Sequence, residues 1–572
     1  MDIDIEVNNE VIKAKKGETI LEALTKNGIK VPTLCHMEGF TPTGACRMCV
    51  VEIEGKKELI PSCSYPIEGW MKIKTHSSRV IKARKMIVEL LLSNHPDDCF
   101  YCIKNQNCEL QKLAYELNIR ERKITGKKAN AKLDYSSPGI IRDTAKCILC
   151  ERCVRVCNEI IGVSALDIIN RGNNTTIATS MDKDINFSNC IICGQCLLVC
   201  PTGALYERTN FDLLNEVLNN PKIKVVAQYS PSVSVSLADE LGLKSGKDIS
   251  QYLNAILKKI GFDKVFYSSF GADIAIHEQA LELNDIIKNK RETPLISSNC
   301  PAWIKYMEQS YPDLIPYVSK VKSPQQILGA LIKRSVADKE NLHPEEIFSV
   351  SIMPCTAKKF EASREEMTYK GVSDIDLVIT TRELAKLIQL YGLSMDNIEP
   401  EMADEPFNNR STASMLLSVS GGLCESIIRS VYKNSTGKEI VKTKLAKLRT
   451  NKLVKKQSVI IDKTKLEFVA VSGLKNVKSI LDDIRNKKSE FHFLEILTCP
   501  DGCINGGGQP LACTEKEIKA RSKTIYDIDN KETINVAGDN EKLNDIYKNH
   551  FYKNHNYKKL LYTYYSERDV MQ

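Results

Sequence analysis

The sequence predicts a multidomain α+β protein in which small cysteine-rich domains precede an α/β domain with parallel sheets. Three observations lead to this fold class. The chain has 572 residues, several times the roughly 150 residues of one domain. Fifteen of its 21 cysteines lie between Cys35 and Cys200. Beyond about residue 210, strand-like and helix-like segments alternate, which is typical of parallel sheets.

The composition favours a cytoplasmic protein with metal or redox chemistry. Hydrophobic residues make up 42% and charged residues 27% of the chain, which excludes collagen, coiled coil and global disorder. No apolar run approaches the roughly 18 to 20 residues that span a bilayer, and the start, MDIDIEVNNE, lacks the features of a secretory signal. Cytosolic thiols stay reduced, so the cysteines indicate metal ligation or redox chemistry. The net charge of +8 is weak support for nucleic-acid binding, and we predict neither nucleic acid nor a membrane as a partner.

The first predicted domain covers residues 1–79. Residues 3–30 alternate like a hairpin and then offer a short helix, ETILEALTKNG. Its cysteines are Cys35, Cys46, Cys49 and Cys63. Only one pair has C-x2-C spacing, which suits a 2Fe-2S cluster because a tight turn such as TGACRMC can aim two sulfurs at one iron. The alternative is a zinc ribbon, which usually has two close pairs. We predict a β-grasp, ferredoxin-like 2Fe-2S domain.

The second predicted domain covers residues 80–125 and contains the segment HPDDCFYCIKNQNC. A lone histidine is usually structural, but His95 stands in a fixed pattern with Cys99, Cys102 and Cys108. This H-x3-C-x2-C-x5-C spacing resembles a 4Fe-4S site of the respiratory NADH dehydrogenase large subunit and of iron-only hydrogenases. The resemblance implies one histidine and three cysteine ligands, and an imidazole ligand raises the reduction potential.

The third predicted domain, residues 126–209, contains an internal repeat. The pattern C-x2-C-x2-C-x3-C occurs twice, 43 residues apart. It is the bacterial two-cluster ferredoxin pattern, in which the fourth cysteine of each run ligates the other cluster. One 4Fe-4S cluster would take Cys147, Cys150, Cys153 and Cys200, and the other would take Cys190, Cys193, Cys196 and Cys157.

The fourth predicted domain, residues 210–514, is α/β. Ligands in such folds bind beyond the carboxyl ends of strands, and four cysteines stand there. Cys300 follows PLISSN, Cys355 follows IFSVSIM, and Cys499 and Cys503 follow FHFLEIL. The other expected strands are KVVAQYS, KVFYSSF, DLVIT and EFVAVSG. Four thiolates from three loops could hold one more electron-transfer cubane.

Three loops resemble the signatures of FeFe hydrogenases, namely SSNCPAW, MPCTAKKFE and EILTCPDGCINGGGQP. The resemblance extends over essentially the whole chain and is to the large clostridial type with four accessory clusters. It implies an H-cluster: a 4Fe-4S cubane on Cys300, Cys355, Cys499 and Cys503, with Cys503 bridging to a diiron subsite that carries CO, CN and azadithiolate ligands. Residues 515–572 resemble the family's carboxy-terminal segment, which wraps the catalytic domain.

The resemblance also implies roles around the diiron subsite. Lys358 matches the lysine that donates to a cyanide, and the GGG run, residues 506–508, permits close backbone approach behind Cys503. Glu282 and Ser319 match outer stations of the proton path. Other pocket positions are matched by Pro231, Ser232, Gln325 and Met353.

The chain departs from the family on the inner proton path. Asn299 stands where the family has a proton-donating cysteine, and Gln279 stands where it has a glutamate. An amide can orient a water but has no proton to release near neutral pH. Glu278 is a poor substitute, because adjacent helix residues point about 100° apart. Further departures are Leu417, Leu497, Cys424 and the STAS segment, residues 411–414.

We therefore predict a divergent ferredoxin hydrogenase that reversibly oxidises H2 to protons, with slow evolution or a bias toward uptake. Two alternatives stay open: a hydrogen sensor with the same cofactor, and an iron-sulfur electron-transfer subunit or cluster-assembly factor without a diiron site. The predicted partners are a ferredoxin or similar small redox protein and the maturation proteins that insert the diiron unit. The basic run at residues 120–132 is a solvated loop by default, or a docking site for an acidic ferredoxin.

Overall fold

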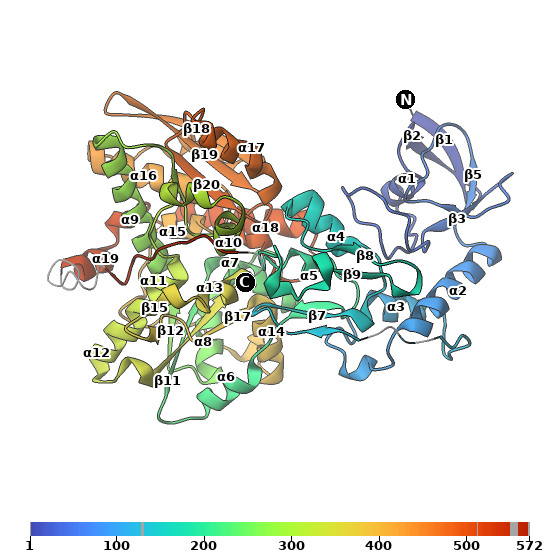
Figure 1. Cartoon of the computed structure of the whole chain (residues 1–572), viewed down its shortest axis with the longest axis horizontal. Helices are drawn as coiled ribbons and strands as arrows, with labels where there is room; N and C mark the ends of the chain where they lie inside the picture. The colour runs from blue at the N-terminus through green and yellow to red at the C-terminus, as the bar shows by residue number, and fades with distance from the viewer. Residues whose placement is uncertain (1, 127, 129–130, 512, 549–558, 570–572) are drawn as a thin grey trace.

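The computed structural model describes residues 2–126, 128, 131–511, 513–548 and 559–569. Its domains follow one another in space as they do in the chain (Figure 1). The N-terminal sheet lies at one end, the large α/β domain at the other, and the elements around α4 and α5 lie between them. Among the described residues, no helix is both long and apolar enough to cross a membrane.

The N-terminal domain is a five-stranded sheet with one helix packed on it. The predicted hairpin and helix are present, and Thr19 and Glu22 form a capping box at the start of α1. In order across the sheet the strands are β2 (Glu10–Lys15), β1 (Asp2–Val7), β5 (Lys72–Lys74), β3 (Val50–Ile53) and β4 (Ile60–Pro61), with α1 at Ile20–Lys26.

Two helices connect this sheet to the ferredoxin-like region. Helix α2 (Ser78–Asn94) ends directly at His95, and the turn Cys99–Tyr101 leads to α3 (Glu109–Glu116). The two helices pack against each other over Val88, Leu110 and Leu113. The same apolar cluster includes Leu34 and Met48 from the N-terminal domain, so the two domains share a core.

The ferredoxin-like region repeats its backbone as well as its cysteines. Leu149 and Ile192 have φ of 54° at matching positions, and Glu151 and Gly194 follow with φ of 62° and 77°. These left-handed residues turn the backbone N–H of Leu149 and Ile192 toward the sulfur of Cys147 and Cys190, each at 3.4 Å. Its elements are β6 (Leu133–Asp134), β7 (Ile140–Asp143), α4 (Arg152–Arg155), a π-helical turn (Val156–Ile161), β8 (Asp167–Ile169), β9 (Thr176–Ala178), α5 (Gln195–Val199) and β10 (Leu205–Glu207).

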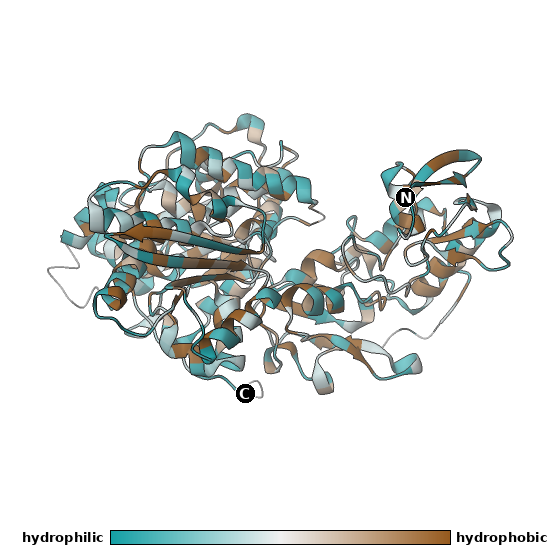
Figure 2. Cartoon of the chain, turned by 90° about the horizontal axis from the view of Figure 1, so that it is seen from above, coloured by the Kyte–Doolittle hydropathy of each residue, from teal (hydrophilic) through white to brown (hydrophobic). Residues whose placement is uncertain are grey.

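The α/β domain contains two four-stranded sheets. The first is parallel throughout, in the order β12 (Lys264–Tyr267), β11 (Lys224–Tyr229), β14 (Ile347–Met353) and β17 (Leu377–Thr380). The second has the order β13 (Leu295–Ile296), β20 (Phe493–Leu497), β19 (Thr464–Ser472) and β18 (Val454–Ile461). The prediction of parallel sheets is wrong for β18, which pairs antiparallel with β19. Figure 2 shows mostly apolar strands in the interior, covered by helices that have both polar and apolar residues.

Helices cover both sheets. Helix α9 packs against α11 and α16. Its Ile274 packs in a core with Phe266 of the first sheet, and its Ile276 packs in a core with Phe468 of the second. The helices of this domain are α6 (Phe211–Leu218), α7 (Pro231–Glu240), α8 (Ser250–Ile260), α9 (Ser269–Lys288), α10 (Pro301–Ser310), α11 (Pro324–Leu331), α12 (Ala337–Glu340), α13 (Ala357–Ala362), α14 (Thr381–Leu390), α15 (Thr412–Leu416), α16 (Gly422–Thr436) and α17 (Lys478–Arg485).

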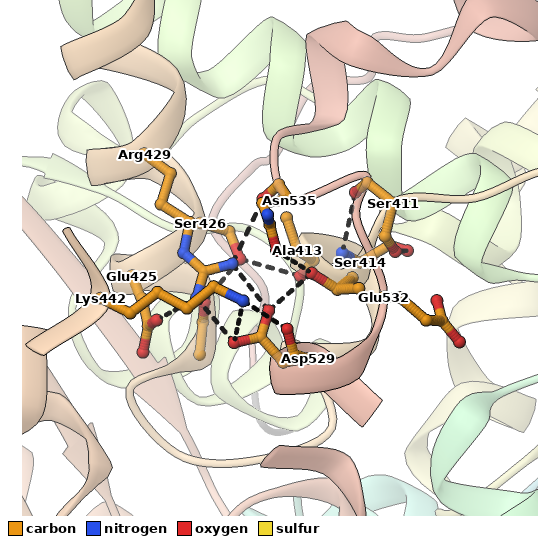
Figure 3. A network of polar contacts seen from close by, with 12 residues as sticks. Ser411, Ala413, Ser414, Glu425, Ser426, Arg429, Lys442, Asp529, Glu532 and Asn535 are labelled. Atoms are coloured by element: carbon orange, nitrogen blue, oxygen red, sulfur yellow. Dashed lines mark hydrogen bonds and ion pairs between the residues drawn. The ribbon is translucent and has the colours of Figure 1, made fainter. Parts of the chain in front are cut away.

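The C-terminal segment is held to this domain by buried charges. Helix α18 (Glu515–Lys531) brings Asp529 against α16, where Arg429 donates to both of its carboxylate oxygens at 2.8 and 2.9 Å. Figure 3 shows this network, in which Lys442 reaches Asp529 beside Arg429. Beyond α19 (Glu541–Ile546), Leu561 accepts a backbone hydrogen bond from Lys322, so the chain returns to α11.

We predict that Asp529→Asn destabilises the α/β domain by about 3–5 kcal/mol, because it leaves buried arginines without a full partner. The flanking arginines hold the pKa of Asp529 well below its usual range despite burial. Its contribution is therefore present above the ordinary aspartate pKa and is lost as the pH falls through the lowered one. Urea unfolding at neutral pH measures the loss. The exposed pair Lys519–Glu515 provides the control, since Glu515→Gln should cost about 0–1 kcal/mol. Equal midpoints for the two variants would contradict the prediction.

Candidate functional site

The candidate site, called the large cavity below, lies between the carboxyl ends of the two sheets. Its cavity has about 980 Å³ of empty space, and the cysteines predicted to converge there all line it. Cys355 follows β14 of the first sheet, whereas Cys300, Cys499 and Cys503 follow β13 and β20 of the second. The site is therefore assembled only when both sheets are in place.

The glycine run after Cys503 lets three backbones meet behind the cavity. A Cβ on Gly506 would lie 2.4 Å from the carbonyl oxygen of Pro354, and one on Gly507 would lie 2.2 Å from that of Cys193. Any side chain at these positions would force the loops apart. The run thus brings the Cys503 loop against the Cys355 loop and against the ferredoxin-like region.

The four thiols are electrostatically coupled. Burial raises the pKa of Cys355 to about 11, and the nearby Cys300 sulfur adds to that rise. Burial and neighbouring thiols raise the pKa of Cys499 and Cys503 as well. Several buried thiolates need nearby cations, and iron supplies that charge in proteins. The donor set therefore suits a cluster.

Lys358 points to this cavity and is held by a buried acid. Its Nζ lies 2.9 Å from Oε2 of Glu361, 2.8 Å from the hydroxyl of Ser323 and 3.4 Å from the carbonyl oxygen of Asn299. Gln325 donates to the same Glu361 oxygen at 3.0 Å. Sequence reasoning singled out Lys358 and Gln325 but missed Glu361, although the i,i+3 spacing in MPCTAKKFE was a signal for it.

Not all of the remaining predicted pocket residues line the cavity. Pro231 and Met353 line the cavity, as do the departing residues Leu417 and Leu497. Ser232 does not line it; its hydroxyl lies 2.9 Å from that of Ser230, which does. Cys424 is fully buried and its thiol donates to the carbonyl of Val469.

The two departing amides of the predicted proton path touch each other. Nε2 of Gln279 donates to Oδ1 of Asn299 at 2.9 Å. Asn299 Nδ2 and Gln279 Oε1 are buried and make no hydrogen bond to the described residues. One donor and one acceptor are thus left beside the cavity, an arrangement that can hold a water.

Of the outer stations, Glu282 lies one turn further along α9, and Ser319 lies in the segment before α11. The hydroxyl of Ser319 donates to Glu282, whose pKa is raised by burial. Glu278 faces elsewhere: its carboxylate accepts hydrogen bonds from the hydroxyls of Tyr547 and Tyr562 in the C-terminal segment. The expectation that Glu278 cannot replace Gln279 agrees with this geometry.

The two halves of the repeat form two further cavities. One, of about 450 Å³, is lined by Cys147, Cys150, Cys153 and Cys200. The other, of about 370 Å³, is lined by Cys157, Cys190, Cys193 and Cys196. These are the two crossed sets that the repeat predicts. Cys193 also lines the large cavity, so the second small site adjoins it directly.

His95 is oriented as a metal ligand would be. Its Nδ1 lies 3.2 Å from the carbonyl oxygen of Pro96, while its Nε2 is buried without a hydrogen-bond partner in the described chain. A carbonyl that is hydrogen-bonded to one ring nitrogen commonly fixes the other nitrogen for metal binding. The nearby turn exposes Cys99, and Phe100 and Tyr101 there are 90% and 94% exposed.

The thiols of the N-terminal domain act on one another. The Cys46 thiol lowers the pKa of Cys35 to about 5, and the Cys63 thiol lowers that of Cys49 to about 6. The expectation that Cys46 and Cys49 aim at one iron stays a prediction. Among the described residues, no three His, Cys, Asp or Glu side chains could hold a single metal ion. Cluster thiolates bind separate irons and do not need to converge on one point.

Shared apolar cores join these sites in series. Cys46, Cys108 and Ile148 pack in one core, so the first three cysteine sites border a common interior. Cys200 and Cys196 share the next core, and Cys193, Cys300 and Cys355 share a third. Of the basic run at residues 120–132, Arg122 and Lys128 pair with Asp97, and Lys127 lies outside the described residues.

Four family models match the chain in the same order. They are the 2Fe-2S iron-sulfur cluster binding domain (residues 1–78), the iron-sulfur binding region of NADH-ubiquinone oxidoreductase G (84–123), the ferredoxin-like domain of NADH-quinone oxidoreductase subunit 3 (137–206) and the C-terminal domain of the iron-only hydrogenase large subunit (223–507). The last of these contains the large cavity.

A curated relative extends over the full length. The NADP-reducing hydrogenase subunit HndD of Solidesulfovibrio fructosivorans is 35% identical over 580 aligned positions, covering 99% of each chain. This chain belongs to the iron-only hydrogenase family. Iron hydrogenase 1 of Clostridium pasteurianum is 32% identical over 95% of this hydrogenase and 96% of the relative. A solved [FeFe]-hydrogenase variant from Chlamydomonas reinhardtii superposes with a TM-score of 0.56 at 29% identity, over 62% of this chain and 99% of that one.

The family membership establishes a hydrogenase-type oxidoreductase with iron-sulfur clusters and an H-cluster domain. Cluster-assembly factors are also similar, such as narfl of Danio rerio, which is 28% identical over 64% of this chain and 90% of the relative. They match a smaller share of this hydrogenase at lower identity.

The lining of the two small cavities predicts which cysteines hold the same cluster. We expect Cys147→Ala with Cys200→Ala to remove one 4Fe-4S cluster, because both line the same cavity. Cys147→Ala with Cys157→Ala, which lie in different cavities, should remove two. Iron content and the low-temperature EPR spectrum of the reduced proteins measure the loss. Equal iron loss in the two double variants would refute the crossed arrangement.

Proposed function

We propose that this hydrogenase interconverts H2 with protons and electrons and exchanges the electrons with a ferredoxin or similar small redox protein. The single observation that supports the catalytic part is the large cavity, in which four cysteines from both sheets meet Lys358. A relay cluster alone needs only the sulfurs. The additional lysine and the space beside it favour a larger cofactor.

The cofactors that fit are one 2Fe-2S cluster, three accessory 4Fe-4S clusters and an H-cluster. We propose that His95 ligates an accessory cluster with Cys99, Cys102 and Cys108, and that Cys503 bridges the cubane and the diiron subsite. When bound, the diiron unit with its CO, CN and azadithiolate ligands supplies the chemistry that forms or splits the H–H bond. Maturation proteins would insert it, and the cytoplasmic location stays a prediction.

Lys358 orients the cofactor and compensates its charge. Glu361 and Ser323 hold the ammonium at the cavity wall, so it is preorganised to donate to an anionic ligand such as cyanide. A hydrogen bond of this charge-assisted kind contributes about 1.5–3 kcal/mol. Pro231, Met353 and the neighbouring leucines exclude water from the same wall.

The electron route follows the shared apolar cores. Electrons would enter at the exposed Cys99 turn or at the N-terminal cluster, because both border the core with Ile148. They would then pass through the two crossed sites to Cys193 at the large cavity. HndD is named as a subunit of an NADP-reducing hydrogenase, so a partner subunit that uses nicotinamide is a second candidate for the electron partner.

The proton route supports a second candidate function, hydrogen sensing. The pair Asn299–Gln279 replaces the two innermost proton carriers with amides, and neither can release a proton near neutral pH. Proton transfer would then rely on water held between the orphaned amide atoms and the Glu282–Ser319 pair. Slow turnover suits a sensor, and it also suits an enzyme that is biased toward uptake.

An infrared spectrum of the maturated protein tests the proposal. We expect bands from bound CO and CN, together with H2 uptake that is supported by oxidised ferredoxin. Turnover with a nicotinamide but not with ferredoxin would change only the proposed electron partner. Absence of these bands from iron-replete, maturated protein would exclude the H-cluster and favour an electron-transfer or assembly role.

Restoring an acid on the inner path should restore proton transfer. We predict that Asn299→Cys raises H2 evolution about tenfold or more, since a positioned general acid typically contributes 10²–10⁴-fold. Asn299→Ser is the matched control, because its hydroxyl is similar in size but far too weak an acid. Evolution assays with a chemical reductant compare the variants. No gain for the cysteine variant would show that another route already carries the protons.

A further inference from the structure

Lys305 is a buried cation with no hydrogen-bond partner in the described chain. It lies on α10, five residues beyond Cys300, and is 4% exposed. Its ammonium group makes no hydrogen bond to the described residues. Leaving a charge unpaired in a protein interior is costly, so its compensation needs a physical cause.

The neighbouring charges do not balance. The ammonium of Lys305 lies 4.8 Å from the ring centre of Phe360, and the guanidinium groups of Arg364 and Arg568 each lie 5.7 Å from the same centre. Both arginines pair with carboxylates: Arg364 with Glu308 at 2.6 Å, and Arg568 with Glu308 and Glu366 at 2.9 Å each. Three cations thus face two anions, and the unmatched positive charge belongs to Lys305.

The helix that carries Lys305 packs beside the cysteines of the second small cavity. Ala302 and Trp303 of α10 lie in the apolar core that Cys190 and Cys193 also border. Phe360, under the ammonium, also packs in the apolar core that contains Cys190 and Cys196.

We propose that Lys305 is the built-in counter-ion of the cluster at Cys157, Cys190, Cys193 and Cys196, and that it raises the reduction potential of this cluster. The inference rests on the proposed cluster ligands and deepens the proposed function. Reduction adds one electron and one negative charge to the cluster without making or breaking a bond. A fixed ammonium in a low-dielectric interior stabilises the more negative, reduced state.

The position of the cluster decides whether its raised reduction potential favours uptake or evolution of H2. Cys193 lines both the cluster cavity and the large cavity, so this site is the first acceptor of electrons that leave the catalytic centre. A raised potential there draws electrons away from the centre. Lys305 therefore favours H2 uptake over evolution.

The alternative is that Lys305 only packs, with its stem on Phe360 and no effect on the cluster. A charge-preserving variant and a neutral variant of similar length separate the two roles. Lys305→Arg keeps the charge, whereas Lys305→Met keeps the apolar stem and removes the charge. Lys475→Met is the matched control, because Lys475 is exposed and its backbone packs near Gly162 of the ferredoxin-like region.

The test is an EPR-monitored redox titration of full-length protein that is reconstituted with iron and sulfide and contains no diiron unit. The cluster is assigned by the signal that Cys196→Ala removes. We expect Lys305→Met to shift its reduction equilibrium at least tenfold toward the oxidised state, which is 59 mV for a one-electron couple. Lys305→Arg and Lys475→Met should leave it within threefold of the unmodified protein.

Two results would overturn the proposal: an unchanged potential in Lys305→Met with full iron content, or an equal fall in Lys305→Arg. If the methionine variant does not fold, Lys305→Gln is titrated with the same expectation. The titration requires neither H2 nor a diiron subsite. Failure of the infrared test would therefore leave this result standing, and an unchanged potential would leave the catalytic proposal standing.

Discussion

The need to bury several thiolates in an apolar interior governs the architecture of this hydrogenase. Most of the cysteine sites border apolar cores, and burial raises the pKa of many of their thiols, as it does for Cys355 and Cys153. Backbone N–H groups such as that of Leu149 offset part of such charge, and nearby cations offset more of it. The protein supplies some of them itself through Lys358 and Lys305, and iron would supply the remainder. The shared cores that exclude water also bring successive sites close enough to exchange electrons.

The catalytic cavity shows how this constraint combines with backbone geometry. Thiols from two sheets can meet only if the loops that carry them approach to within contact distance, and Gly506 and Gly507 permit that approach. The same loop contacts Cys193, so the cavity and the nearest relay site are built by one set of packing contacts. A change that loosens the glycine run would therefore disturb catalysis and electron transfer together.

Two proposed features bear on the rate and direction of the reaction. The amides of Gln279 and Asn299 hydrogen-bond to each other, and neither can release a proton near neutral pH. On the proposed proton path they would slow transfer in both directions. The proposed charge of Lys305 beside the last relay site would instead favour the removal of electrons from H2. The C-terminal segment supports this arrangement, because Tyr547 and Tyr562 hold Glu278 away from the amides.

Sequence spacing alone predicted which cysteines of the repeat share a cavity, because that spacing is local and is read without knowledge of the fold. It also predicted strand β14 to the residue. It missed β18, whose alternation of polar and apolar residues acquires meaning only against β19. Only the tertiary structure placed Glu361 behind Lys358 and left Lys305 unpaired near Cys190. Those relations depend on distances between segments that are far apart in the chain, and no periodicity in the sequence encodes such distances.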